Sequence, residues 1–199
     1  MRLKIAFFAV LCAASVFFTG CGDKTVYQNG TADIKNANIS ISIPEDWTVV
    51  TDDKVYDELY KGLSDEFGSA KELKKSFEDN GERLLLNAQS HDGNVVALFS
   101  ETEKGESGAA EILRAVHDTT VFDLRSSGFY TESSFEEYTW GGASGVMSVI
   151  KVSEKNGEPA FMEEREFCFE RDDLIFSLQI HITGGFEYEA DSIEISAAG

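Results

Sequence analysis

The side chains best suited to chemistry lie in two neighbouring segments near the C-terminal end, and both segments alternate with a period of two. The alternating polar residues are Glu164, Glu166, Cys168 and Glu170 in the first segment and Ser177, Gln179 and His181 in the second. If Arg171 pairs with Leu174 across a two-residue turn, Glu164 faces His181. Directly opposed side chains on paired strands lie about 5 Å apart. The spacing therefore predicts that a carboxylate and an imidazole meet on one sheet face.

Such a pair can serve a cation or metal site, or it can be a cross-strand ion pair. Zinc takes three or four protein ligands of this kind, and the pattern supplies only Glu164 and His181. We therefore predict the ion pair, with the carboxylate favouring the charged imidazole. No metal site and no cofactor is expected, and the metal site remains the alternative.

The remaining candidates are single residues. Trp140 is followed by Gly141-Gly142 and is a candidate for a binding surface. Cys168 has no clear His or Asn partner in the sequence, so we interpret it as a packed core thiol. His117 lies late in a predicted helix, where a structural role is expected. The Gly-x-Ser-x-Gly pattern of a nucleophile elbow does not occur, so the sequence predicts no catalytic set and no enzyme.

The N-terminal region has the pattern of an export signal. Arg2 and Lys4 precede an apolar run from Ile5 to Phe18, which is shorter than the roughly 20 residues of a membrane-spanning helix. The segment Phe18-Thr19-Gly20-Cys21 resembles the lipobox of bacterial lipoproteins, although Phe18 replaces the usual aliphatic residue. The resemblance implies cleavage after residue 20 and a diacylglyceryl lipid on Cys21. A plain secretory signal is the alternative.

The composition limits the possible partners. The chain has 199 residues with 36 acidic and 17 basic side chains, a formal charge of −19, and its longest Lys/Arg run is Lys74-Lys75. Phosphate binding needs clustered positive charge, so nucleic acid is excluded as an expected partner. We expect residues 1–20 to be the signal, 21–36 a lipidated cysteine with a flexible polar tether, and 37–199 one domain.

The domain shows alternating strand and helix patterns, which predict an α+β class with an antiparallel sheet flanked by helices. The expected strands are 39–43, 47–50, 82–90, 95–99, 129–140, 143–153, 161–169 and 174–182, and the expected helices are a stretch from about 54, then 69–79, 106–126 and a short 186–195. Asp92-Gly93 and Asn156-Gly157 are hairpin signals.

The start of the domain, from Ile39 through Pro44 to Trp47, resembles the "strand, Pro, acidic, Trp" opening of PsbP-like domains in bacterial lipoproteins. The resemblance implies an α/β/α sandwich and a bias toward binding, without a shared catalytic constellation. We therefore expect a protein anchored by lipid on Cys21 to the extracytoplasmic side of the cell membrane. Its domain would bind an envelope protein or a small molecule. The alternative is an envelope enzyme, such as a metal-assisted hydrolase using Glu164 and His181.

Overall fold

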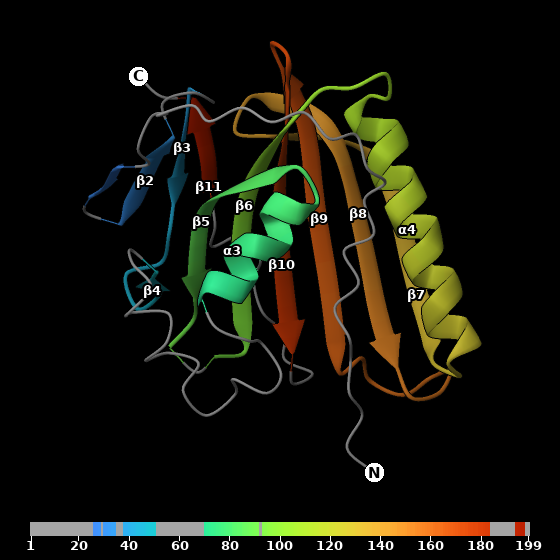
Figure 1. Ribbon diagram of the computed structural model, residues 1–199. Coiled ribbons are helices and arrows are strands. Elements are labelled where there is room, and N and C mark those ends of the chain that lie inside the picture. The colour runs from blue at the N-terminus through green and yellow to red at the C-terminus, as the bar shows by residue number, and fades with distance from the viewer. Residues whose placement is uncertain are drawn as a thin grey trace.

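The computed structural model of the chain describes residues 26–28, 30–34, 38–50, 70–91, 93–183 and 194–197. These residues form two antiparallel sheets, with helices packed on the larger one (Figure 1). The smaller sheet has the order β1-β2-β3-β11 and contains β1 (Val26–Gln28), β2 (Thr31–Ile34), β3 (Ile39–Ser42) and β11 (Glu194–Ala197). The predicted α+β class with an antiparallel sheet and helices is thereby confirmed.

The larger sheet has the order β4-β5-β6-β10-β9-β8-β7. Its strands are β4 (Thr48–Val49), β5 (Glu82–Gln89), β6 (Val95–Glu103), β7 (Tyr130–Trp140), β8 (Ala143–Ser153), β9 (Met162–Arg171) and β10 (Leu174–Thr183). The last four strands form the predicted meander, because long alternating segments are separated by short turns.

The β9–β10 pairing has the predicted register. Arg171 pairs with Leu174, and Glu164 pairs with His181. The two-residue turn between these strands needs a left-handed backbone conformation, and Asp172 supplies it with φ of +54°.

Two helices among the described residues lie on the same face of this sheet. Helix α3 (Ala70–Asp79) packs on β5, and helix α4 (Ala109–Ser126) packs on β7, β8 and β9. Both agree with the helices predicted over 69–79 and 106–126. Gly108 gives α4 no side-chain cap, and Glu170 takes that role, because its Oε1 accepts the Ala109 N–H at 2.7 Å.

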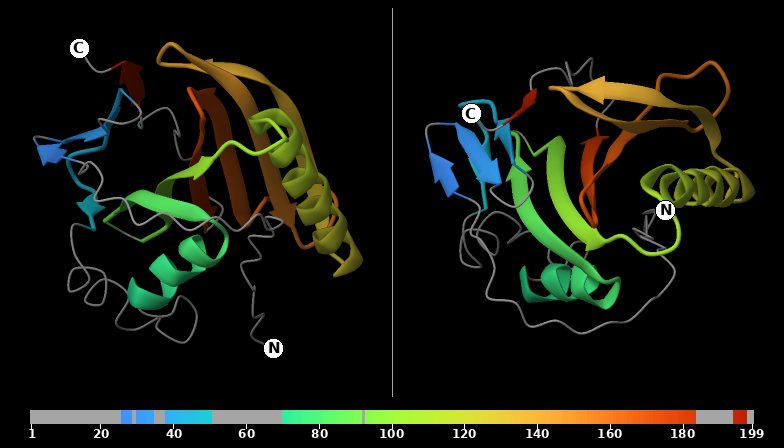
Figure 2. Two further views of the ribbon diagram at one scale, coloured as in Figure 1. Left: turned by 45° about the horizontal axis from the view of Figure 1, so that its top comes forward. Right: turned by 90° about the horizontal axis from the view of Figure 1, so that it is seen from above.

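The smaller sheet lies over one side of the larger sheet (Figure 2), and the main hydrophobic core is formed by side chains of both sheets. The smaller sheet contributes Ala32, Ile34, Ile39 and Ile41, each at most 1% exposed. The larger sheet contributes Phe99, Phe167, Phe169 and Phe176, each at most 2% exposed. Burial of these side chains supplies the main driving force for packing one sheet on the other.

The tether prediction over residues 21–36 is wrong for residues 26–28 and 31–34. Residues 26–28 and 31–34 form β1 and β2, and β2 pairs with β3. Ala32 and Ile34 point into the core while Asp33 is exposed, so a short alternating strand lies inside a polar stretch. Two apolar side chains are enough here because the neighbouring strand β3 already presents a buried face.

The short helix predicted over 186–195 is wrong where it can be compared, since Glu194 and Ile195 belong to strand β11. The layers also differ from the expected α/β/α sandwich. The described helices cover one face of the larger sheet, and the other face is covered by the smaller sheet (Figure 2).

Some predicted segments lie outside the described residues. These are the signal and Cys21, the helix expected from about residue 54, and most of the segment 186–195. Neither α3 nor α4 is long and apolar enough to cross a membrane, and the described residues contain no other helix that is.

Candidate functional site

The face of the larger sheet that carries the helices contains an unusual set of buried polar side chains. Register partners share a face, so the pairings define which residues lie together. We call these residues the polar band: Glu82, Asn87 and Gln89 on β5, Ser100 on β6, Glu164 and Glu166 on β9, and Ser177, Gln179 and His181 on β10. The band crosses four neighbouring strands of the sheet, in the order β5-β6-β10-β9.

Glu166 is the most connected member of the polar band. Its Oε1 accepts hydrogen bonds from Ser177 Oγ at 2.7 Å and Gln179 Nε2 at 3.3 Å. The Sγ of Cys168 lies 3.6 Å from the same oxygen. Burial is the largest effect on this carboxyl and raises its pKa, the charge of Glu164 raises it further, and the hydrogen bond from Ser177 opposes the rise.

Glu82 occupies the other end of the band. Its Oε2 accepts a hydrogen bond from Ser100 Oγ at 3.0 Å, and the residue is 8% exposed. Burial raises the pKa of Glu82 to about 7, with the Ser100 hydrogen bond opposing the rise and the charge of Glu166 adding to it. This carboxyl therefore exchanges its proton near neutral pH.

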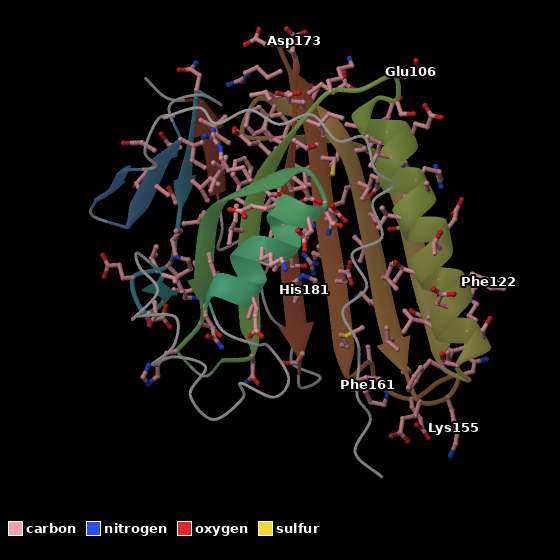
Figure 3. The ribbon with its side chains drawn as sticks, in the orientation of Figure 1. Glu106, Phe122, Lys155, Phe161, Asp173 and His181 are labelled. Carbon is pink, nitrogen blue, oxygen red and sulfur yellow. The ribbon has the colours of Figure 1, made fainter. Side chains whose placement is uncertain are left out.

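Glu164 and His181 meet as predicted, but they do not form the predicted ion pair. His181 Nδ1 lies 4.0 Å from Glu164 Oε2, and Figure 3 shows His181 near the middle of the sheet. Burial lowers the pKa of His181 to about 4 and outweighs the opposing attraction of Glu166. Burial also raises the pKa of Glu164. The expected charged imidazole is wrong, because desolvation exceeds the attraction of a nearby carboxylate.

Cys168 and His117 are packed into the fold as expected. Burial raises the pKa of the Cys168 thiol well above its usual value, which keeps it protonated and a poor nucleophile. His117 Nδ1 lies 2.8 Å from Ser148 Oγ, and its ring packs edge-on against Phe135. Burial lowers the pKa of His117, so this histidine is a neutral packing residue.

Trp140 lies on the opposite face from the polar band. Its ring packs against Phe167 at 5.8 Å and Tyr138 at 6.4 Å, and it is half-buried against the main core. The three candidate binding residues from the sequence therefore do not form one site. Glu164 and His181 lie together, and Trp140 belongs to a different surface.

Four members of the band were missed from the sequence, namely Glu82, Asn87, Gln89 and Ser100. A signal for two of them exists, because Asn87 and Gln89 alternate with the buried Leu86 and Ala88. The three consecutive leucines before them conceal this alternation. They contain a β-bulge between Leu84 and Leu86 that shifts the pattern by one residue.

The polar band can accept hydrogen bonds and protons at several points. In the described ranges, no three His, Cys, Asp or Glu side chains are arranged to hold a metal ion. Glu164 and His181 would supply two ligands of a metal site. The geometry is that of a row of acceptors in which two serine hydroxyls donate to carboxyl groups.

Comparisons with known proteins give little further information. No family model matches the chain, and no curated protein matches it. A solved structure that is similar is the solution structure of cyanobacterial PsbP (CyanoP) from Synechocystis sp. PCC 6803. It has 10% sequence identity and a TM-score of 0.46 over 84% of this chain and 86% of that chain. Similarity at this level carries no conclusion about function, and the PsbP-like family stays a prediction.

Proposed function

We propose that this chain is a bacterial lipoprotein, attached by lipid on Cys21 to the extracytoplasmic side of the cell membrane, whose domain binds a ligand. The anchor is supported by the charged start, the short apolar run and the Thr19-Gly20-Cys21 sequence. A diacylglyceryl group supplies the two chains that stable anchoring needs. Membership of the PsbP-like family, with its bias toward binding, is part of the same proposal.

The polar band is the observation that carries the binding function. A sheet face that packs under helices is ordinarily apolar, and burying polar groups there is costly unless they are paired. The band keeps three carboxyl groups and three amide side chains at such a place. A binding site explains this, because ligand sites combine apolar walls with a few convergent polar groups.

The proposal does not include catalysis. The Cys168 thiol is held protonated by burial, which raises its pKa, and His181 Nδ1 lies 4.0 Å from the Glu164 carboxyl. The alternative hydrolase has one observation in its favour, since a neutral imidazole is the form that binds zinc. Metal analysis of the full chain purified in detergent distinguishes the two, because a stoichiometric metal that His181→Ala removes would favour the hydrolase.

The anchor is tested by Cys21→Ser. We expect this variant to leave the membrane fraction and to lose lipid labelling, whereas Cys168→Ser, which also removes one thiol, stays with the membrane. Retention of Cys21→Ser in carbonate-washed membranes would contradict lipid anchoring.

The binding function is tested by native mass spectrometry of the full chain released from its own membranes in detergent. We expect a bound small molecule that is lost in Glu166→Gln. It should be kept in Glu132→Gln, which removes a carboxylate from an exposed position on β7. A parent protein that carries nothing would argue against a small-molecule site.

A further inference from the structure

Two serines face each other at the centre of the polar band. Ser100 on β6 and Ser177 on β10 are register partners. Each hydroxyl donates to a carboxylate one strand further out, Ser100 to Glu82 at 3.0 Å and Ser177 to Glu166 at 2.7 Å. The result is a Glu–Ser–Ser–Glu row across four strands. Because each hydroxyl proton is directed outward, both serine oxygens can only accept at the centre.

Two further acceptors on the same face lack donors. Asn87 and Gln89 are 4% and 6% exposed, and their side-chain oxygens meet no hydrogen-bond donor in the described part of the chain. The register places Asn87 in the row of Gln179 and Gln89 in the row of His181. Buried acceptors without donors are rare and call for a physical explanation, such as an ion, a water or a ligand that supplies the donors.

The helices pack on the outer strands of the band. Among the described elements, α3 packs on β5 and α4 packs on β7, β8 and β9. On the central strands, Ser100 is 2% exposed, whereas Ser177, Gln179 and His181 on β10 are half-buried. The acceptors on β5 and β9 thus lie on either side of β10 side chains that keep some exposure to solvent.

The width of the band selects the kind of ligand. From β5 to β9 there are three strand spacings of about 4.8 Å, or about 14 Å in all. A metal ion collects all its ligands within about 2.6 Å and cannot serve acceptors so far apart. None of the nine band residues is Lys or Arg, so the band offers acceptors and negative charge without an internal cation.

We propose that the polar band binds a linear polyamine, a flexible chain with protonated amino groups at both ends. This inference rests on the proposed binding function and names its ligand class. One ammonium group donates to Asn87 and Gln89 on β5, and the other donates to Glu166 and Glu164, which lie in the same two rows on β9. Each ammonium offers three donors, and the formal charge of −19 attracts cations from solution.

Binding should release protons. Burial raises the pKa of Glu164 and of Glu166, which favours the protonated form of each carboxyl. A nearby ammonium favours the carboxylate. Proton release therefore separates a polyamine seated against Glu164 and Glu166 from one held loosely on the acidic surface.

The experiment is calorimetric titration of the full chain in detergent with spermidine at pH 7, in two buffers of different ionisation enthalpy. We expect one saturable site and net proton release. Glu166→Gln and the double variant Asn87→Leu with Gln89→Leu should each weaken binding by about tenfold, as loss of a charge-assisted contact does. The matched control Glu132→Gln removes one exposed charge and should keep the parent affinity.

Several outcomes would overturn the inference. They are no saturable binding, binding without proton release, or an equal loss of affinity in the control and the band variants. The double variant guards against misfolding of Glu166→Gln, because leucine replaces two oxygens that have no donor among the described residues, and the hydrogen bond that is lost with Gln89 is the 3.3 Å one from its Nε2 to Gly93 O. If spermidine fails while another molecule leaves the membrane with the protein, the ligand class is wrong and the binding function stands. If neither binds, both fail.

Discussion

The two faces of the larger sheet are built from the same strands and hold together by opposite means. On the face toward the smaller sheet, Phe99, Phe169 and Phe176 stack with ring centroids 5.3 to 6.4 Å apart. On the face toward the helices, the same strands carry Ser100, Glu166 and Ser177, joined by hydrogen bonds. The alternation of side chains along a strand lets a single meander present both chemistries.

The difference shows that the aromatic face stabilises the fold and that the buried polar groups of the helix face destabilise it. Apolar burial on the aromatic face is favourable without any partner geometry. Polar burial on the helix face is costly, and the raised carboxyl pKa of Glu82, Glu164 and Glu166 records that cost. A fold keeps such groups where function requires them, because removing them tends to stabilise the protein.

The largest expected effect is on the aromatic face. Phe176 is 0% exposed and stacks on two other phenylalanines, so Phe176→Ala should cost about 4 kcal/mol of unfolding free energy. Urea unfolding followed by circular dichroism measures it. The control is Phe122→Ala at a 69% exposed position on α4, which Figure 3 shows pointing away from the sheet. Its change should stay within about 0.5 kcal/mol.

The next effect is on the polar band and depends on pH. Folded Glu82 keeps its proton up to a pKa of about 7, whereas its ordinary value is 4.5. The folded state binds more protons between these values, so stability falls as pH rises through this window. Glu82→Gln should reduce the fall, with no gain over the parent at pH 4 and a gain of up to about 3 kcal/mol at pH 8, and the raised pKa of Glu164 and Glu166 keeps the rest of it.

Urea unfolding at pH 4, 6 and 8 measures this slope. Glu132→Gln on the exposed side of β7 should change stability by the same small amount at each pH. If the unfolding free energy of Glu82→Gln changes with pH as steeply as that of the parent, burial of the Glu82 carboxyl does not destabilise the fold as described above.

The smallest expected effect concerns Glu170, which belongs to the same strand as Glu166 but serves α4. The Lys104 side chain and the Ala109 N–H lower the pKa of Glu170. Glu170→Ala removes the helix cap and should cost about 1 kcal/mol. Thermal unfolding compares it with Glu103→Ala, an exposed glutamate at the end of β6. Equal losses would mean that the cap does not hold the helix over the band.

The parts of the fold that the sequence predicted well are those with long, regular patterns. The β7 to β10 meander and the pairing of Glu164 with His181 follow from alternation and one short turn. Strand β2 was missed because a short strand needs its neighbours to be recognised. The charge state of His181 was missed because burial, which lowers its pKa, depends on what covers the residue. Sequence spacing predicts which side chains face each other on paired strands. Only the packing around them determines how far they are removed from water.

The length of the two-residue turn at Asp172 and Asp173 sets the register of strand β10 against β9. One extra residue there would shift β10 by one step, and each of its side chains would then appear on the other side of the sheet. His181 would enter the aromatic layer, and Phe176 would enter the band. One insertion would therefore exchange the two faces of the sheet for every residue of β10. In evolution, length changes should therefore accumulate in the longer connection over residues 154–161 and be purged from this turn.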